Sequence, residues 1–168
     1  MLIIFGGLPG TGKTTIARSL ARALKAVHLR VDTIEQALRN SGTLKDDVGP
    51  AGYMAAYRIA EENLRIGLPV IADSVNPLQV TREAWLAAAQ RAGVEAAEVE
   101  VICSDEIEHR RRVETRISDI ERHMQPTWQD VVDRDYETWQ TQPIVVDTAT
   151  QAVDGIVTEL IARLELRP

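Results

Sequence analysis

The sequence predicts an α/β fold in which helices cover both faces of a parallel sheet. Two observations carry this prediction. Short apolar runs alternate with helical stretches along the whole chain, as they do in proteins built from strand–helix–strand units. The 168 residues contain no internal repeat, low-complexity segment or long linker, and their number fits one hydrophobic core. We therefore expect a single domain that spans residues 1–168.

The apolar runs place five strands. The run at residues 2–5 is apolar throughout, which favours a central strand that is buried on both faces. The run at residues 27–31 alternates apolar residues with His28 and Arg30, so we expect it nearer the edge of the sheet. The other expected strands are residues 70–72, 97–103 and 144–146.

Helical periodicity and terminal signals place the helices between these strands. A first helix begins at about Lys13, because apolar residues recur at every fourth position from Ile16 onward. A helix that opens at residues 126–127 is expected to carry Trp128, Val132, Tyr136 and Trp139. The other expected helices are residues 33–39, 53–66, 80–92 with Gly93 as C-cap, a helix from about 105, and residues 151–164. Glycines, a proline and two aspartates make residues 41–52 an expected mobile loop.

Composition and charge argue against several classes of protein. Cys103 is the only cysteine, which rules out an intrachain disulfide and leaves no set of thiolates for zinc. The formal net charge of -6 and the lack of a long basic run argue against binding to duplex DNA. No apolar run approaches the roughly 18 to 20 residues that span a bilayer, so no membrane segment is expected. The start MLIIFGG lacks the features of a signal peptide, so we expect a cytoplasmic protein.

The segment GLPGTGKT at residues 7–14 fits the phosphate-binding signature G-x-x-x-x-G-K-[ST], with an apolar strand before it and an amphipathic helix after it. Its glycines let backbone N–H groups turn toward phosphate oxygens beside a helix N-terminus. Lys13 would reach the β- and γ-phosphates, and the Thr14 hydroxyl would coordinate Mg²⁺. The residues expected to bind the nucleotide, ATP with Mg²⁺, are Gly7, Pro9, Gly10, Thr11, Gly12, Lys13, Thr14 and Thr15. The alternative is a glycine-rich turn that binds nothing.

Two aspartates follow predicted strands at the sheet edge where ligands collect. Asp73 follows an apolar strand beside the phosphate loop, and an aspartate in this position holds Mg²⁺ directly or through water. The alternative for Asp73 is a cap of the next segment. Asp32 follows the strand at residues 27–31, where a carboxylate could accept the proton of an attacking hydroxyl. The alternative for Asp32 is a helix N-cap with Glu35 as its capping-box partner, and both roles can coexist.

Arginines gather between the strand at residues 97–103 and the helix at residue 128. They are Arg110, Arg111, Arg112, Arg116 and Arg122. Arginine forks stabilise the charge that spreads over a transferred phosphoryl group, and a closing lid excludes water. Arg112 and Arg116 are four residues apart on one helix face, so we expect them to be the catalytic arginines of a lid over about residues 112–126. The alternative is a solvated helix stabilised by pairs such as Glu108 with Arg112.

Asp147 follows the last predicted strand, on the side where an adenine ring would lie. This position makes Asp147 a candidate for contact with the base. The alternative is a strand end that caps the next helix. The three histidines lack metal-ligand spacing and are expected to be structural or on the surface.

The segments GLPGTGKTT, VDTIEQAL, LPVIADSVN, HRRRVETR and VVDT together resemble the small P-loop kinases. This broad group includes chloramphenicol phosphotransferase, zeta toxins, gluconate kinase and the kinase domain of polynucleotide kinase. The resemblance covers essentially the whole chain. It implies the three-layer fold of P-loop NTPases with a five-stranded parallel sheet in the order 2-3-1-4-5, ATP and Mg²⁺, and a hydroxyl acceptor. By position it also implies Asp32 as the base and Arg112 and Arg116 as lid arginines.

The acceptor stays open, because the chain lacks the familiar kinase motifs after its second strand. Polynucleotide kinases place an arginine three residues after the base, where this chain has Glu35. Glu35 therefore favours a neutral or cationic acceptor. We expect a kinase that phosphorylates a small-molecule metabolite or antibiotic. The alternatives are a nucleotide or polynucleotide 5′-kinase and a non-catalytic ATP-binding module.

Overall fold

The computed structural model describes residues 1–42 and 48–165. The strands within them form a parallel sheet in the order β2-β3-β1-β4-β5. They are β1 (Leu2–Gly6), β2 (Val27–Arg30), β3 (Val70–Asp73), β4 (Ala96–Ile102) and β5 (Ile144–Asp147). The helices are α1 (Lys13–Leu24), α2 (Val31–Asn40), α3 (Ala51–Arg65), α4 (Gln79–Ala92), α5 (Glu106–Thr115), α6 (Trp128–Val132) and α7 (Val153–Arg163). The predicted α/β fold and strand order are confirmed.

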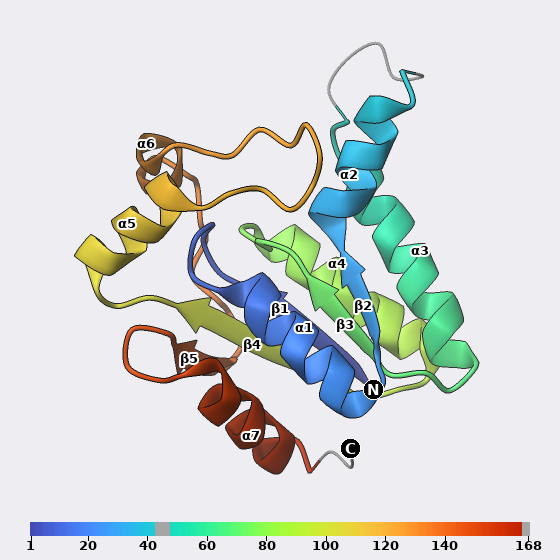
Figure 1. The fold of residues 1–168 in the computed structure, drawn as a ribbon. Helices are drawn as coiled ribbons and strands as arrows, with labels where there is room; N and C mark the ends of the chain where they lie inside the picture. Colours follow the sequence, from blue (N-terminus) through green and yellow to red (C-terminus); the bar gives the residue numbers. More distant parts are fainter. Residues whose placement is uncertain (43–47, 166–168) are drawn as a thin grey trace.

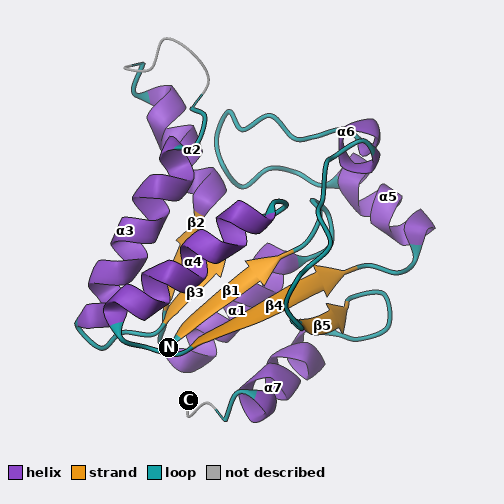
Figure 2. Cartoon of the chain, turned by 180° about the vertical axis from the view of Figure 1, so that it is seen from behind, coloured by secondary structure: helices purple, strands orange, loops and turns teal. Residues whose placement is uncertain are grey.

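Helices cover both faces of the sheet and give the fold three layers. α1 and α7 lie on the face that is in front in Figure 1, whereas α3 and α4 lie on the opposite face, seen in Figure 2. Alternate residues of β1 enter the two cores: Ile3 and Phe5 pack with α1 and α7, and Leu2 and Ile4 pack with α3 and α4. β1 is therefore central and buried on both faces, as its apolar sequence predicts.

The parallel strands bring their carboxyl ends to one edge of the sheet. The register places Asp73 of β3 beside Phe5 of β1 and beside Arg30 of β2. The loop after β1 therefore lies next to the ends of β2 and β3, below the segment that joins α5 to α6 (Figure 1). No helix among the described residues is long and apolar enough to cross a membrane.

The expected end of the second strand is wrong by one residue, and this changes the setting of Asp32. β2 ends at Arg30, and α2 begins at Val31, which is buried in the core under α3 and α4. Arg30 occupies the N-cap position in an extended conformation, without a capping hydrogen bond from its side chain. Asp32 lies in the first turn of α2, where its charge suits the helix dipole. The capping box of Asp32 with Glu35 is therefore absent.

The helix expected from residue 128 is much shorter than predicted. Thr127 caps it through a reciprocal capping box with Asp130, but α6 ends at Val132. Tyr136 and Trp139 lie beyond it in irregular structure and pack against the guanidinium of Arg82, which is 5.2 Å and 4.0 Å from their ring centroids. Aromatic contact with a buried arginine, rather than helical periodicity, explains the spacing of these residues.

Two further boundaries differ from expectation. α5 ends at Thr115 with Arg116 as its C-cap, and the Arg116 N–H donates to Arg112 O, so Arg116 lies one turn beyond Arg112 at the end of the helix. α3 begins at Ala51, inside the loop expected at residues 41–52. Residues 43–47 of that loop lie outside the described part of the chain. The predicted Gly93 C-cap of α4 is confirmed, with φ of 69°.

Candidate active site

The loop between β1 and α1 has the backbone that its glycines predict. Gly7, Gly10 and Gly12 have φ values of 131°, 86° and 94°, which belong to the region that favours glycine. A Cβ atom at Gly7 would lie 2.2 Å from the Val101 carbonyl oxygen. Gly12 is the N-cap of α1, so the loop delivers the chain directly to a helix N-terminus. This geometry provides the anion-binding end of a helix that the signature requires.

Neighbouring elements hold the loop in shape. The Gly7 N–H donates to the Val75 carbonyl oxygen at 3.0 Å, and the Thr11 hydroxyl donates to Leu8 O at 2.9 Å. His109 of α5 lies with Nε2 2.8 Å from Pro9 O. A carbonyl can only accept, so Nε2 of His109 carries the proton in this contact. α5 is thereby tied to the phosphate loop.

Lys13 is buried and turns back onto its own loop. Its Nζ donates to the Leu8 carbonyl oxygen at 2.9 Å. Burial lowers the pKa of Lys13 to about 8, although the negative charges of Asp73 and Asp32 oppose this effect. With a pKa of about 8, Lys13 still carries its proton at neutral pH, and a bound phosphate would stabilise this charged form further.

Asp73 is buried at the end of β3, beside the phosphate loop. Its Oδ2 lies 3.1 Å from Nε2 of His28. Burial opposes ionisation of Asp73, but the hydrogen bond from His28 and the charge of Lys13 outweigh it and keep the pKa below its ordinary value. Asp73 is therefore an ionised carboxylate close to Thr14, whose hydroxyl also lowers its pKa through a hydrogen bond.

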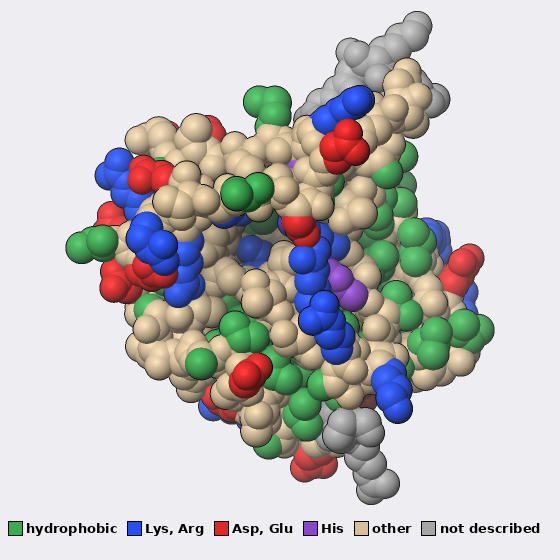
Figure 3. Space-filling model, in the orientation of Figure 1, with side chains coloured by type: hydrophobic (Ala, Val, Ile, Leu, Met, Phe, Trp, Pro, Cys, Tyr) green, Lys and Arg blue, Asp and Glu red, His purple; other side chains and the backbone are tan. Residues whose placement is uncertain are grey.

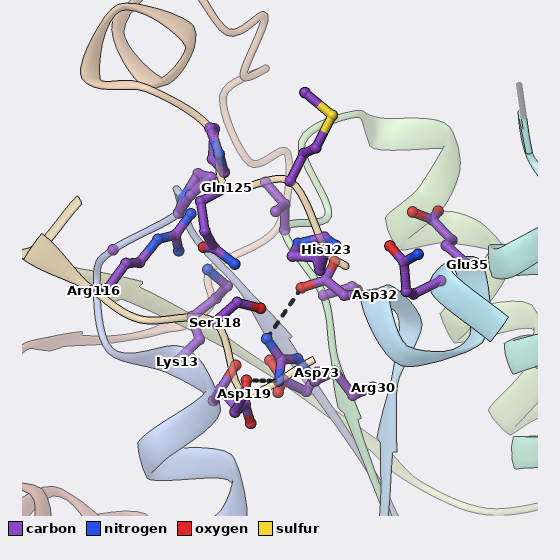
Figure 4. A pocket seen from close by; sticks show the side chains of 18 of the residues that line it. Lys13, Arg30, Asp32, Glu35, Asp73, Arg116, Ser118, Asp119, His123 and Gln125 are labelled. Atoms are coloured by element: carbon purple, nitrogen blue, oxygen red, sulfur yellow. Dashed lines mark hydrogen bonds and ion pairs between the residues drawn. The ribbon is translucent and has the colours of Figure 1, made fainter. Parts of the chain in front are cut away.

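Asp32 faces the same pocket from the first turn of α2 and belongs to a chain of charges. Nη2 of Arg30 lies 3.5 Å from Oδ2 of Asp32, and Nη1 of Arg30 donates to Oδ1 of Asp119 at 2.8 Å. Arg18 of α1 forms an ion pair with the same aspartate. Asp119 belongs to the segment that joins α5 to α6. Figure 4 shows the side chains of Asp32, Arg30 and Asp119 converging beside Lys13 and Asp73.

The two predicted lid arginines have different surroundings. Arg112 donates to the Thr148 hydroxyl at 2.8 Å and to Glu108 at 2.8 Å, so it ties α5 to the turn after β5. Arg116 points toward Lys13 in Figure 4. Burial lowers the pKa of Arg116, and the charge of Asp32 counteracts this in part. Nε of Arg116 is buried without a hydrogen-bond partner among the described residues. Arg116 therefore has a donor to offer a ligand.

One pocket of about 1220 Å³ is bordered by the phosphate loop, by Asp32 and Asp73, and by both predicted lid arginines. Figure 3 shows this hollow beneath the α5–α6 segment, with Lys and Arg side chains inside it. Its lining includes the predicted site residues Pro9, Gly10, Gly12, Lys13, Thr14, Thr15, Asp32, Asp73, Arg112 and Arg116. The structure thus brings most of the predicted site together around one cavity.

Three predicted site residues do not line this pocket: Gly7, Thr11 and Asp147. The side chain of Asp147 accepts hydrogen bonds from the backbone N–H groups of Ser104 and Ala149, both at 3.0 Å. It joins the loop after β4 to the turn after β5. Gly7 and Thr11 shape the phosphate loop through the contacts described above.

Sequence reasoning missed several residues of the pocket. They include Arg18, Arg30, Ser118, Asp119, His123, Gln125 and Arg134. Some of them lie in the predicted lid, for which the sequence pattern indicated only arginines as site residues. The pairing of Arg30 with Asp119 joins residues 89 positions apart, so no local pattern could reveal it.

Comparisons with known proteins agree with this architecture. The sequence profile of the AAA domain family matches residues 2–137. No curated protein sequence matches significantly.

Solved structures with the same fold are only distantly related in sequence. A candidate kinase from Chloroflexus aurantiacus has a TM-score of 0.75 at 23% identity, over 98% of this chain and 95% of that one. Kti12 from Chaetomium thermophilum, in complex with ADP-AlF3, has a TM-score of 0.72 at 22% identity, over 100% of both chains. APS kinase CysC from Mycobacterium tuberculosis, in complex with AMPPNP and APS, has a TM-score of 0.72 at 20% identity, over 98% and 96%. The chain belongs to the AAA domain family and has the fold of the P-loop kinases that its sequence resembles.

Proposed function

We propose that this protein is a kinase that transfers the γ-phosphoryl group of ATP to a hydroxyl of a small molecule. One observation carries the proposal: a single pocket contains both the phosphate loop and the Asp32 carboxylate on the opposite wall. Phosphoryl transfer needs a donor phosphate and a group that orients the attacking hydroxyl within one enclosed site. In this proposal the whole chain, residues 1–168, works as one domain with a lid at about residues 112–126.

The donor side would be held by the phosphate loop. Its backbone N–H groups and Lys13 would bind the phosphates, and Lys13 would exchange its contact with Leu8 O for a phosphate oxygen. Arg116 would contribute its unpaired donor to the charge that develops on the transferred group. Arg112 would hold α5 against Thr148 while contributing positive charge. Asp147 is proposed to shape the adenine side of the site.

The donor groups present fit Mg²⁺. Thr14 and the ionised Asp73 offer oxygen ligands beside the phosphate loop. Clusters of three or more His, Cys, Asp or Glu side chains that could hold a metal ion are absent from residues 1–42 and 48–165. Such a sparse site matches the habit of Mg²⁺ to bind one or two protein groups together with substrate phosphates and water. When bound, Mg²⁺ would neutralise charge on the β- and γ-phosphates.

Asp32 is the proposed base. Its side chain enters the pocket from α2, across from Lys13 (Figure 4). The nearest arginine nitrogen, Nη2 of Arg30, lies 3.5 Å away, which is too far for a strong hydrogen bond. A carboxylate oxygen therefore remains available to accept the proton of the attacking hydroxyl.

The charges near Asp32 favour an acceptor without a phosphate group. Arg18 and Arg30 are paired with Asp119, and Arg39 lies 3.7 Å from Glu35. An acceptor phosphate would have to displace these carboxylates. In addition, Phe, Tyr and Trp are absent from the described lining of the pocket, so the large aromatic rings on which nucleobases commonly stack are missing there.

Glu35 itself gives less support to a cationic acceptor than its sequence position suggests. It lies apart from Asp32 and Lys13 in Figure 4, and its carboxylate is paired with Arg39. The proposed acceptor is therefore a polar small molecule with a free hydroxyl, neutral or carrying an amino group.

An ATP-consumption screen tests this function. The panel would contain sugars, aminoglycosides, amino alcohols, nucleosides and 5′-phosphorylated nucleosides, assayed with MgATP. We expect one of the first three classes to raise turnover above the basal rate. Asp32→Asn should abolish that increase and retain ATP affinity, whereas Lys13→Ala should lose both.

The control variant is Asp154→Asn, which changes an exposed aspartate in the first turn of α7 and should behave as the wild type. Turnover only with nucleosides or their phosphates would favour the nucleotide-kinase alternative. ATP binding with no acceptor-dependent turnover would favour a non-catalytic module.

A further inference from the structure

A row of four charged side chains connects the lid to the proposed base. It runs from Arg18 of α1 to Asp119 of the lid, then to Arg30 at the end of β2, and then to Asp32 of α2. Figure 4 shows the last three in contact along the pocket wall, with dashed lines joining Arg30 to both carboxylates. We name this row the ion-pair chain.

Arg30 is the central member of the ion-pair chain. Its side chain is only 12% exposed, and its two terminal nitrogens are directed to different carboxylates. Nη1 makes a hydrogen bond of 2.8 Å with Asp119, whereas Nη2 stays 3.5 Å from Asp32. The planar fork of arginine holds these two nitrogens at a fixed separation, which the single nitrogen of a lysine ammonium does not reproduce.

The lid has a carboxylate matched to this arginine. The charges and hydrogen bonds of Arg30 and Arg18 lower the pKa of Asp119 far below its ordinary value, the hydrogen bond from Arg30 being the largest influence. Asp119 is therefore ionised at any physiological pH. Its side chain is 44% exposed, so solvent can reach the hydrogen bond between Asp119 and Arg30 and this bond can break. We call this contact between Asp119 and Arg30 the clamp.

We propose that Arg30 is a positioning residue that couples closure of the lid to the freedom of the proposed base. With the lid closed, Asp119 takes the strong hydrogen bond of Arg30 and leaves Asp32 with a longer contact. When the lid opens, Arg30 loses Asp119, and Asp32 is the other carboxylate with which it is paired among the described residues. A full ion pair between them would make the Asp32 carboxylate less basic, and this carboxylate must accept the hydroxyl proton.

This coupling would suppress phosphoryl transfer until the pocket is covered. An open site is also a wet site, in which water competes with the acceptor for the phosphoryl group. Release of the base only on closure therefore links proton acceptance to the exclusion of water. The role of Asp32 in this inference rests on the proposed kinase function, whereas the clamp between Asp119 and Arg30 does not.

Hydrogen exchange tests the clamp without any acceptor. Asp119→Asn removes the charge and keeps the shape, and Glu121→Gln is the matched control because Glu121 lies on the same segment and is 86% exposed. We expect Asp119→Asn to speed exchange of the amides in residues 116–127 about fivefold, the effect of about 1 kcal/mol from a partly exposed ion pair. Glu121→Gln should leave their exchange unchanged. Equal exchange in the two variants would overturn the clamp.

Arg30→Gln and Arg30→Lys test the central position. Both should speed lid exchange, although less than Asp119→Asn, which also breaks the pair with Arg18. Arg30→Gln combined with Asp119→Asn should match Asp119→Asn alone, because Arg30 reaches the lid through Asp119. Lid exchange that remains normal in Arg30→Gln would mean that Arg18 alone holds Asp119, and the inference would fail.

The link to the base is tested with the acceptor found in the screen. Asp119→Asn should lower kcat for transfer about fivefold and leave the affinity for MgATP unchanged, since Asp119 is paired with Arg18 and Arg30, which lie outside the phosphate loop. Rapid lid exchange with unchanged kcat would refute the coupling and leave the kinase standing. If no acceptor were found, the exchange data would still decide the clamp, so the two failures can be told apart.

Discussion

Lys13 offers a test of the phosphate site that needs no knowledge of the acceptor. Its ammonium is buried against its own loop, and burial lowers its pKa from 10.5 to about 8. This difference corresponds to about 3 kcal/mol by which folding disfavours the charged lysine. Lys13→Met removes the charge and keeps an unbranched side chain. The substitution should therefore stabilise the nucleotide-free protein while it destroys the nucleotide site.

The expected gain is smaller than the full electrostatic term. Lys13→Met also removes the hydrogen bond from Nζ to Leu8 O, which offsets about 1 kcal/mol. The remaining gain of about 2 kcal/mol should raise Tm by about 4 to 8 °C for a chain of this size. Differential scanning fluorimetry at pH 7, with and without MgATP, measures both effects. MgATP should raise the Tm of the wild type and leave that of Lys13→Met unchanged.

The dependence of folding stability on pH tests the sign of this effect of Lys13 separately. Between pH 8 and 10.5 the unfolded chain holds a proton on Lys13 that the folded protein has released, so the stability of the wild type rises with pH. The advantage of Lys13→Met should accordingly shrink across this window. Lys25→Met, at an exposed lysine, should show neither effect. A lower Tm for Lys13→Met at pH 7, or a retained response to MgATP, would refute the reasoning.

Three further predictions concern other parts of the site. Gly10→Ala places a Cβ 2.5 Å from Val113 at φ of 86°, so urea denaturation should show a loss of about 1 to 3 kcal/mol. Asp73→Asn should raise the Mg²⁺ concentration required for half-maximal ATP turnover at least about tenfold, measured by magnesium titration; an unchanged requirement would remove Asp73 from the metal site. Arg82→Met leaves the carbonyl oxygens of Asn76 and Glu137 without their donor, so the free energy of unfolding, measured by urea denaturation, should fall by about 3 kcal/mol. Arg110→Met, at an exposed arginine, should leave this free energy unchanged.

The sequence predicts the donor half of this molecule well, because that half is encoded locally. A strand, a glycine-rich turn and a helix follow one another within residues 2–24, and Gly7, Gly10 and Gly12 supply the positive φ angles of the turn. The strand order follows from the family resemblance. The aspartate at residue 73 is predictable because a parallel strand brings its carboxyl end to a known edge.

The parts that sequence reasoning predicts poorly depend on contacts between distant residues. Tyr136 and Trp139 have a spacing that imitates a helix, yet they serve to stack on Arg82, more than 50 positions earlier. Val31 continues the alternation of a strand, yet it is buried as the first residue of α2. The partners of Asp119 lie on α1 and β2, and only the folded chain brings them to the lid.

The segment proposed as a lid is anchored at both ends, and this anchoring would reduce the conformational entropy lost when it closes. At one end, His109 and Arg112 hold α5 against the phosphate loop and the turn after β5. At the other end, Arg82 holds the segment after α6 through hydrogen bonds and ring contacts. If this segment closes over substrate as proposed, the conformational entropy lost on closure would be confined to the short stretch between Arg116 and Thr127. A segment with two fixed ends would move only a short distance, so the proposed kinase would spend little binding energy on closing it.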